Sequence, residues 1–77
     1  MVTSLGQLKP GDQATVVGYS DPTSSYARHL TSLGLIPGTE LRMTRRAPLG
    51  DPIEIEFRGT RLALRPGEAD TLQLESR

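Results

Sequence analysis

Apolar and polar positions alternate along the middle of the chain, and a period of two is typical of a β-strand with one buried face. Over residues 39–47 one face carries Leu41, Met43, Arg45 and Ala47, and the other carries Arg42, Thr44 and Arg46. In the next run Ile53, Ile55 and Phe57 alternate with Glu54, Glu56 and Arg58. The loop at residues 48–51 is short enough to make the two runs an antiparallel hairpin. In that hairpin we expect a cross-strand ion pair between Arg46 and Glu54.

Three shorter runs with β-strand character predict further strands, at residues 13–19, 62–64 and 72–74. The run at residues 62–64 follows the hairpin after a turn at Gly59 and Thr60. Together with the hairpin, these runs make five short strands.

Between the first strand and the hairpin, the period changes to that of a helix. The apolar positions of this helix are Tyr26, Leu30 and Leu33, which form one stripe at 3.6 residues per turn. Asp21 or Thr23 is in place to cap the N-terminus. Gly34 suits the left-handed residue that follows a helix, and Pro37 prevents continuation, so the helix should end at about Leu33. It is the only helix that the pattern predicts.

The sequence Leu-x-Pro-Gly occurs three times, at residues 8–11, 35–38 and 64–67. Proline presets the φ angle of the first central position of a type II turn, and glycine supplies the positive φ of the second. We therefore expect a stiff turn at each repeat. After the third repeat, residues 68–70 are expected to form at most one 3₁₀ turn.

This order of elements predicts a mainly β protein. Five short strands, with one short helix between the first and second, close most naturally into a small SH3-like barrel whose first and last strands are adjacent. An OB-fold is the nearest competitor, but its helix usually falls between the third and fourth strands. A length of 77 residues indicates a single domain that spans residues 1–77.

Composition removes several classes of function. The chain has no cysteine, which excludes disulfides, iron–sulfur clusters and thiolate zinc sites. Nine Lys and Arg balance nine Asp and Glu, so no net positive charge attracts a nucleic acid. With Tyr26 and Phe57 on expected core faces, only Tyr19 is left for stacking on bases. No apolar run approaches the length of a membrane span, and we expect a cytoplasmic protein that does not insert into the membrane.

The residues that carry chemistry do not form a catalytic or metal-binding motif. His29 is the single histidine, and a tight metal site needs two to four ligands at fixed geometry. His29 is therefore only a weak candidate ligand, and we expect it to be solvated beside the apolar stripe. No phosphate-binding glycine loop or paired-carboxylate cleft is present either. We expect a protein that is not an enzyme and has no resident cofactor, so that any divalent metal binds weakly or between molecules.

One long run of residues resembles a known family. The resemblance rests mainly on residues 32–38 and 45–55, supported by Tyr26, Leu30 and residues 62–65. In these positions the chain is similar to the FeoA family, ferrous iron transport protein A. The resemblance implies an SH3-like domain that supports Fe(II) uptake by binding and modulating FeoB, a membrane permease with a cytosolic GTP-binding domain, which would recruit it to the inner face of the membrane. A related SH3-like domain is the last domain of some iron-dependent repressors. The resemblance therefore also implies an alternative function, a transition-metal-binding sensor.

The candidate partner-binding surface combines the helix, the second Pro-Gly corner and the loop of the hairpin. Its residues are Tyr26, Leu30, Leu33, Leu35, Ile36, Pro37, Gly38 and Leu49. A second group is expected to act structurally, namely Gly34, Arg45, Asp51 and Pro52. Parity places Arg45 on the inward face at a strand end, where an unpaired charge is costly, so it should reach Asp51 or loop carbonyls and brace the hairpin. An arginine finger for GTP hydrolysis is the alternative for Arg45. Because the barrel is partly open, its exposed strand edges could pair with a second copy, so a homodimer is compatible with the sequence.

Overall fold

The computed structural model describes residues 2–48 and 52–76. Its strands are β1 (Val2–Thr3), β2 (Gln13–Tyr19), β3 (Glu40–Arg46), β4 (Ile53–Phe57), β5 (Thr60–Leu64) and β6 (Leu72–Ser76). Its helices are the 3₁₀ helix η1 (Leu5–Gln7) and the α-helices α1 (Ser25–Ser32) and α2 (Pro66–Ala69). All but the two-residue strand β1 and the helices η1 and α2 were predicted, and the expectation of a single helix is wrong.

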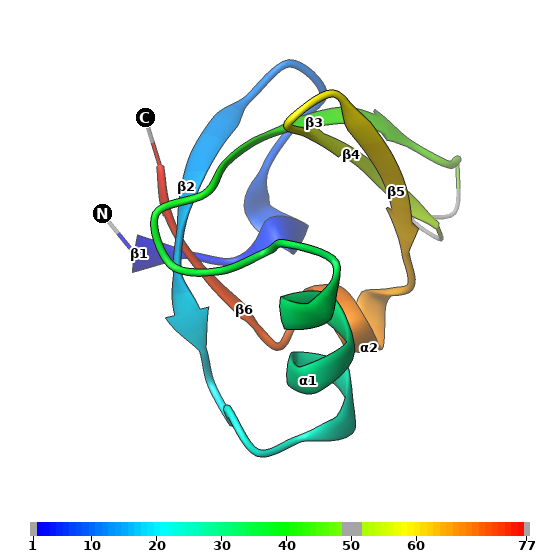
Figure 1. The fold of residues 1–77 in the computed structure, drawn as a ribbon. Helices are drawn as coiled ribbons and strands as arrows, with labels where there is room; N and C mark the ends of the chain where they lie inside the picture. Colours follow the sequence, from blue (N-terminus) through cyan, green and yellow to red (C-terminus); the bar gives the residue numbers. More distant parts are fainter. Residues whose placement is uncertain (1, 49–51, 77) are drawn as a thin grey trace.

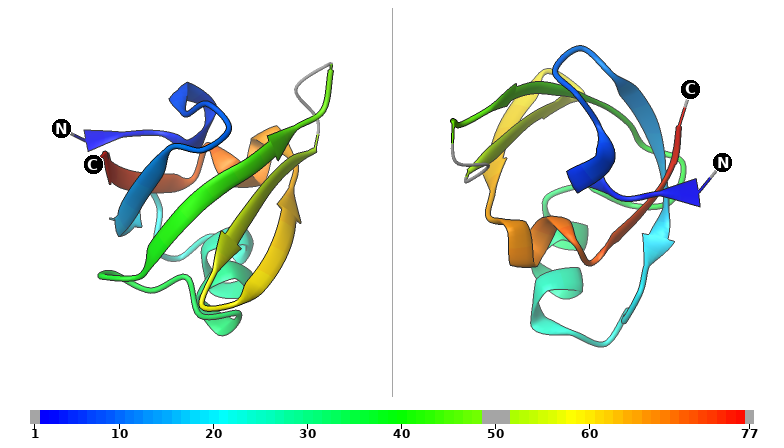
Figure 2. Two further views of the ribbon diagram at one scale, coloured as in Figure 1. Left: turned by 90° about the horizontal axis from the view of Figure 1, so that it is seen from above. Right: turned by 180° about the vertical axis from the view of Figure 1, so that it is seen from behind.

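The strands form one antiparallel sheet in the order β1-β6-β2-β3-β4-β5. The sheet curls around the core, α1 lies outside one end of it, and the two chain termini lie close together (Figures 1 and 2). The first and last of the predicted strands are adjacent as expected, because Val16 of β2 pairs with Leu74 of β6. The helix α1 falls between β2 and β3, in agreement with the prediction.

Side chains from every strand except β1 and from all three helices fill the interior of this curled sheet. The alternation predicted for β4 holds, since Ile53, Ile55 and Phe57 are buried while Glu54 and Glu56 are not. The larger core residues also include Leu5, Leu30, Leu35, Met43, Leu64, Leu72 and Leu74. Burial of each Leu or Ile side chain contributes about 2 kcal/mol to folding, so this core is the main source of stability in a chain without cysteine.

The first two Leu-x-Pro-Gly repeats form the expected type II turns. Gly11 and Gly38 both have a φ of 94°, and the turns close through hydrogen bonds from Asp12 N to Lys9 O and from Thr39 N to Ile36 O.

The first of these turns is hydrogen-bonded to β3, which follows the second turn, and the second is hydrogen-bonded to β2, which follows the first. The N–H of Gly11 donates to Met43 O, and the N–H of Met43 donates to Asp12 O. On the other side, Gly38 N–H donates to Val16 O and Val16 N–H donates to Thr39 O. Both pairs are β-bulges with glycine in the left-handed position. The two repeats therefore fix the two ends of the β2–β3 pairing.

The third repeat folds differently, and its predicted type II turn is wrong. Pro66 is the first residue of α2, and Gly67 is not among the glycines with positive φ. The N–H groups of Glu68 and Ala69 both donate to Arg65 O, so the chain turns as a helix. Proline suits the first position of a helix, because its missing N–H would have no partner there. Burial of Ala69 in the core favours the helical turn over an open one.

A bulge in β3 changes which arginine lies opposite which residue of β4. Met43 pairs with Ile55, but the register then shifts, so that Arg45 pairs with Glu54 and Arg46 with Ile53. The predicted pairing of Arg46 with Glu54 is wrong, and so is the inward position of Arg45, which is exposed. Thr44 is the extra residue, and its hydroxyl donates to the carbonyl of Glu54 at 3.1 Å. That hydrogen bond satisfies a backbone group near the interruption of the ladder.

Candidate functional site

The helix α1 is rotated relative to the stripe that its spacing predicts. Its buried residues are Ala27 and Leu30, whereas Tyr26 and Leu33 are exposed by 47% and 42%. The expectation that Tyr26 faces the core is therefore wrong. Ser24 caps the helix by accepting a hydrogen bond from Ala27 N at 3.1 Å, so neither predicted cap is used.

The C-terminal end of α1 explains this rotation. Gly34 has a φ of 107°, as predicted, and its N–H donates to Thr31 O. The N–H of Leu35 donates to Leu30 O, which completes the paired hydrogen bonds of a Schellman motif. That motif brings the side chains of Leu30 and Leu35 together, and both are fully buried. With these two leucines inside, Leu33 points outward.

Two side chains hold the segment after α1 against the sheet. The hydroxyl of Tyr19 donates to Leu35 O at 2.6 Å, and Thr31 forms a second side-chain hydrogen bond with it. Burial raises the pKa of Tyr19, an effect that the hydrogen bond from Thr31 partly offsets. On the other side, the buried Thr39 donates its hydroxyl to Gly34 O at 3.0 Å. The segment after α1 is therefore held by hydrogen bonds on both sides.

The surface that remains exposed on this braced segment is apolar. Tyr26 and Leu33 are two helical turns apart on one side of α1, and Ile36, exposed by 40%, follows directly after the Schellman motif. We call Tyr26, Leu33, Ile36 and Pro37 the apolar corner. His29 lies between the first two on the same side of the helix and is exposed, as expected. Three of the five large exposed hydrophobic residues of the described chain thus lie in one place.

The predicted partner-binding set divides into two groups. Tyr26, Leu33, Ile36, Pro37 and Gly38 are exposed as a binding role requires. Leu30 and Leu35 are fully buried core residues, so their assignment to a contact surface is wrong. The expectation failed for Leu35 because its role in the Schellman motif is visible only when the helix end is built. Leu49 lies outside the described residues.

The predicted bracing contact of Arg45 with Asp51 also falls outside the described residues. Pro52, named with these two, is exposed. The neighbouring Arg46, which sequence reasoning did not single out, makes three hydrogen bonds to η1 and the residue after it. Its Nη2 donates to Gly6 O at 2.7 Å, to Leu8 O at 3.2 Å and to Leu5 O at 3.5 Å. Because Nη2 carries two hydrogens, at least one N–H is shared between two of the three carbonyls.

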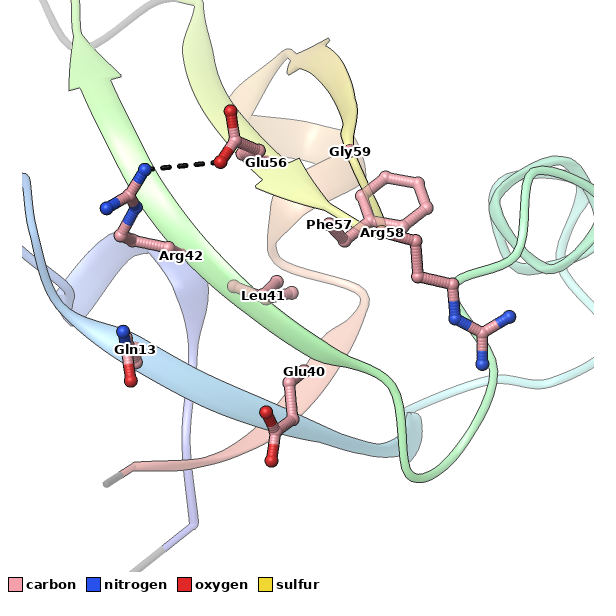
Figure 3. Close-up of a pocket in the computed structure, with 8 residues that line it drawn as sticks. All are labelled: Gln13, Glu40, Leu41, Arg42, Glu56, Phe57, Arg58 and Gly59. Atoms are coloured by element: carbon pink, nitrogen blue, oxygen red, sulfur yellow. Dashed lines mark hydrogen bonds and ion pairs between the residues drawn. The ribbon is translucent and has the colours of Figure 1, made fainter.

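A shallow groove crosses the outer face of β2, β3 and β4, and charged side chains line much of it (Figure 3). Arg42 donates to Glu56 at 3.2 Å, and Arg61 contacts the same carboxylate at 3.3 Å. The hairpin tip that borders the groove is a tight turn in which Arg58 and Gly59 have φ angles of 50° and 76°. Because these charges are exposed and partly pair with one another, the groove resembles an ordinary solvated sheet face more than an enclosed ligand pocket.

A metal site requires several donor side chains close together. Within residues 2–48 and 52–76, no three His, Cys, Asp or Glu side chains lie close enough together to hold a metal ion. For the metal-sensor alternative, this part of the chain therefore offers no ready-made ligand cluster. Of the helices in the same described ranges, none combines the length and the apolar character that crossing a membrane requires.

Solved structures of similar proteins agree with this architecture. The FeoA protein of Chlorobium tepidum is 38% identical, over 96% of this chain and 70% of that one, with a TM-score of 0.84. The zinc complex of FeoA from Stenotrophomonas maltophilia is 30% identical, over 95% of this chain and 89% of that one, with a TM-score of 0.83. That protein is described as a unique prokaryotic SH3 domain protein and a candidate activating factor of bacterial ferrous iron transport. The predicted SH3-like fold is confirmed.

A manganese-dependent transcriptional repressor shares the fold at 22% identity, over 99% of this chain but 42% of the repressor, with a TM-score of 0.87. At that identity the likeness concerns the fold alone. The model of the FeoA domain matches residues 3–76, nearly the whole chain. The sequence of strands and helix, the curled sheet and this match agree, and the chain belongs to the FeoA family.

Proposed function

We propose that this protein is a non-enzymatic cytosolic accessory protein of ferrous iron transport that binds and modulates a FeoB-type membrane permease. The family to which the chain belongs is not a known enzyme family, and relatives are described as iron(II) transport and iron uptake regulatory proteins. Recruitment by the permease would bring the protein to the inner face of the membrane.

The observation that carries the proposal is the apolar corner. Tyr26, Leu33 and Ile36 are large hydrophobic side chains that remain between 40% and 47% exposed on a segment held by backbone and side-chain hydrogen bonds. A rigid apolar surface binds a partner at low entropic cost, because little has to be ordered on association. Tyrosine is also among the residue types enriched at the centres of interfaces.

The charges around the corner indicate the sign of the partner surface. Among the residues of α1, Arg28 and His29 carry or can carry positive charge, and no acidic residue is present. We therefore expect the permease to present an apolar contact flanked by carboxylates. Binding should weaken as salt rises, since exposed charges are screened.

Titration of the ¹⁵N-labelled protein with the soluble GTP-binding domain of the permease tests this proposal. We expect the largest chemical-shift changes at the apolar corner, and loss of binding in Ile36→Asp. Val2→Gln is the matched control, because Val2 is exposed by 64% on the two-residue strand β1, away from the corner. Absence of shifts at the corner, with full-length permease also unbound, would overturn the proposal. So would a permease complex that Ile36→Asp does not weaken.

A further inference from the structure

Strand β5 is the longer of the two edges of the sheet. Its one neighbour in the strand order is β4, whereas the other edge, β1, has only two residues. In the two views of Figure 2, β5 lies at one rim of the curled sheet. An edge strand presents backbone donors and acceptors that a further strand can pair with.

The hairpin register shows which groups these are. Phe57 pairs with Thr60 across the two-residue turn, so they form a hydrogen-bonded pair, and such pairs recur at every second residue. Leu62 and Leu64 therefore direct their backbone groups toward β4. Arg61 and Ala63 direct their N–H and C=O groups away from β4, along the open rim.

The side chains of β5 do little to protect this rim. The strand contains no proline, and its register with β4 has no bulge. Ala63 is small and exposed, and the Arg61 side chain is already paired on the outer face with Glu56. Leu62 is half-buried, on the face that packs against the core. Proline, bulges and charged side chains are the usual means of preventing strand addition, and of these β5 carries only the charge of Arg61.

We propose that β5 pairs antiparallel with β5 of a second copy of this chain, about a two-fold axis at Leu62. In that register the backbone groups of Arg61 bond to those of Ala63 in the second copy, and reciprocally. The two Leu62 side chains meet across the axis, where the strands approach most closely. The result is a continuous sheet through both molecules, with an isologous interface.

Charge complementarity selects this register over its neighbours. A shift by two residues in one direction places Arg61 opposite Arg61, and a shift in the other direction places Arg61 opposite Arg65. Like charges directly opposite are destabilising. A shift by one residue turns the rim groups of one strand toward groups of the other that already bond to β4.

The register about Leu62 also places Arg61 of the second copy beside Ala63, which lies opposite Glu54 in its own hairpin. Because alanine is short, the exposed guanidinium of Arg61 can exchange its pairing with Glu56 of its own chain for the carboxylate of Glu54 in the other molecule. On the outer face of the new strand pair, Arg61 of each molecule then lies near Glu54 of the other. These opposite charges favour association in the register about Leu62.

The contact is small, so the dimer should be weak. One strand pair falls at or below the low end of specific interfaces, which is about 1,200 Å² of total buried surface. We expect a dissociation constant in the high micromolar to millimolar range, visible as a concentration-dependent sedimentation coefficient. The apolar corner lies on α1 and the segment after it, so the dimer leaves it free.

Two variants at position 63 test the register without breaking the hairpin. Ala63→Pro removes a rim donor that β4 does not use, and proline is tolerated at such edge positions. Ala63→Arg places an arginine beside Glu54 of its own chain and opposite Arg61 of the second copy. Ala63→Thr is the control, because it keeps the N–H and suits a strand.

Sedimentation velocity across a dilution series from millimolar to low micromolar protein gives the result. We expect a weak dimer for the wild type and Ala63→Thr, and monomers for Ala63→Pro and Ala63→Arg with unchanged circular dichroism. The unchanged circular dichroism separates repulsion from misfolding, and the double variant Glu54→Ala/Ala63→Arg, which lacks the new intrachain pair, should also be monomeric. A wild type that stays monomeric at millimolar concentration would overturn the proposal, as would a dimer unaffected by Ala63→Pro and Ala63→Arg.

Discussion

The hydroxyl of Tyr19 donates a hydrogen bond to the carbonyl of Leu35 at 2.6 Å. Tyr19 is the last residue of β2, and Leu35 follows α1, so this contact joins the sheet to the segment that carries the apolar corner. Because Leu35 is also bonded to Leu30 through its backbone N–H, the helix end, the corner and the sheet form one connected unit. The position of the exposed Ile36 follows from that unit.

Tyr19→Phe should lower the free energy of unfolding by about 1–2 kcal/mol, because it leaves the Leu35 carbonyl and the Thr31 side chain without this partner. Urea denaturation measures the change. Tyr26→Phe is the control, since Tyr26 is exposed and its hydroxyl is bonded to none of the described residues. A loss in Tyr26→Phe as large as that in Tyr19→Phe would contradict this account.

The raised pKa of Tyr19 predicts that the stability of the protein depends on pH in the alkaline range. Burial raises the pKa of Tyr19 in the folded state above its ordinary value of 10.0, so the folded state holds the phenolic proton more tightly than the unfolded state. Stability from this group is complete below pH 10 and is lost as pH rises through the folded pKa. Denaturation at several pH values from 8 upward should show a smaller alkaline loss in Tyr19→Phe than in the wild type. Equal losses of stability in the wild type and in Tyr19→Phe would rule out Tyr19 as a source of the alkaline loss.

The second and third Pro-Gly pairs should respond differently to alanine. Gly38→Ala should destabilise the protein by about 1 kcal/mol, because alanine is strained at a φ of 94° although the space around it is open. Gly67→Ala should stabilise it by up to about 1 kcal/mol, because Gly67 lies in α2 without positive φ and also faces open space. Thermal unfolding of both variants measures the difference. Changes of the same sign would contradict the structural difference between the second and third repeats.

The two adjacent arginines of β3 should also differ. Arg46→Ala should cost about 1 kcal/mol, since it removes the donor shared by three backbone carbonyls around η1. Arg45→Ala, at an exposed position opposite Glu54, should change stability by less than about 0.5 kcal/mol. Chemical denaturation compares the two. If Arg45→Ala proved the more destabilising, the role assigned to Arg46 would be wrong.

Arg45→Ala also tests the arginine-finger alternative, in an assay separate from folding. A variant of normal stability that still binds the permease but no longer stimulates its GTP hydrolysis would support direct action of Arg45 on the nucleotide. Normal stimulation would exclude that role.

Local patterns were sufficient wherever a residue's conformation depends on near neighbours. The alternation of Ile53, Ile55 and Phe57 predicted β4 and its buried face, and the positive φ of Gly34 and Gly38 followed from the helix end and the turn type. The exposed Ile36–Gly38 part of the candidate site was also identified from sequence. Each of these features depends on steric preferences within a few residues.

Only the tertiary structure decided the features that depend on distant partners. The bulge at Thr44 requires the carbonyl of Glu54 on the neighbouring strand, and it reverses the parity of Arg45 and Arg46. The rotation of α1 requires Leu35 to pack inside with Leu30, which exposes Tyr26 and Leu33. The sequence by itself determined every strand except the two-residue β1, the first two Pro-Gly turns and the family. Packing determined which residues of α1 and of the end of β3 face the core, because a periodic pattern shows that a stripe exists but not which neighbours will compete to cover it.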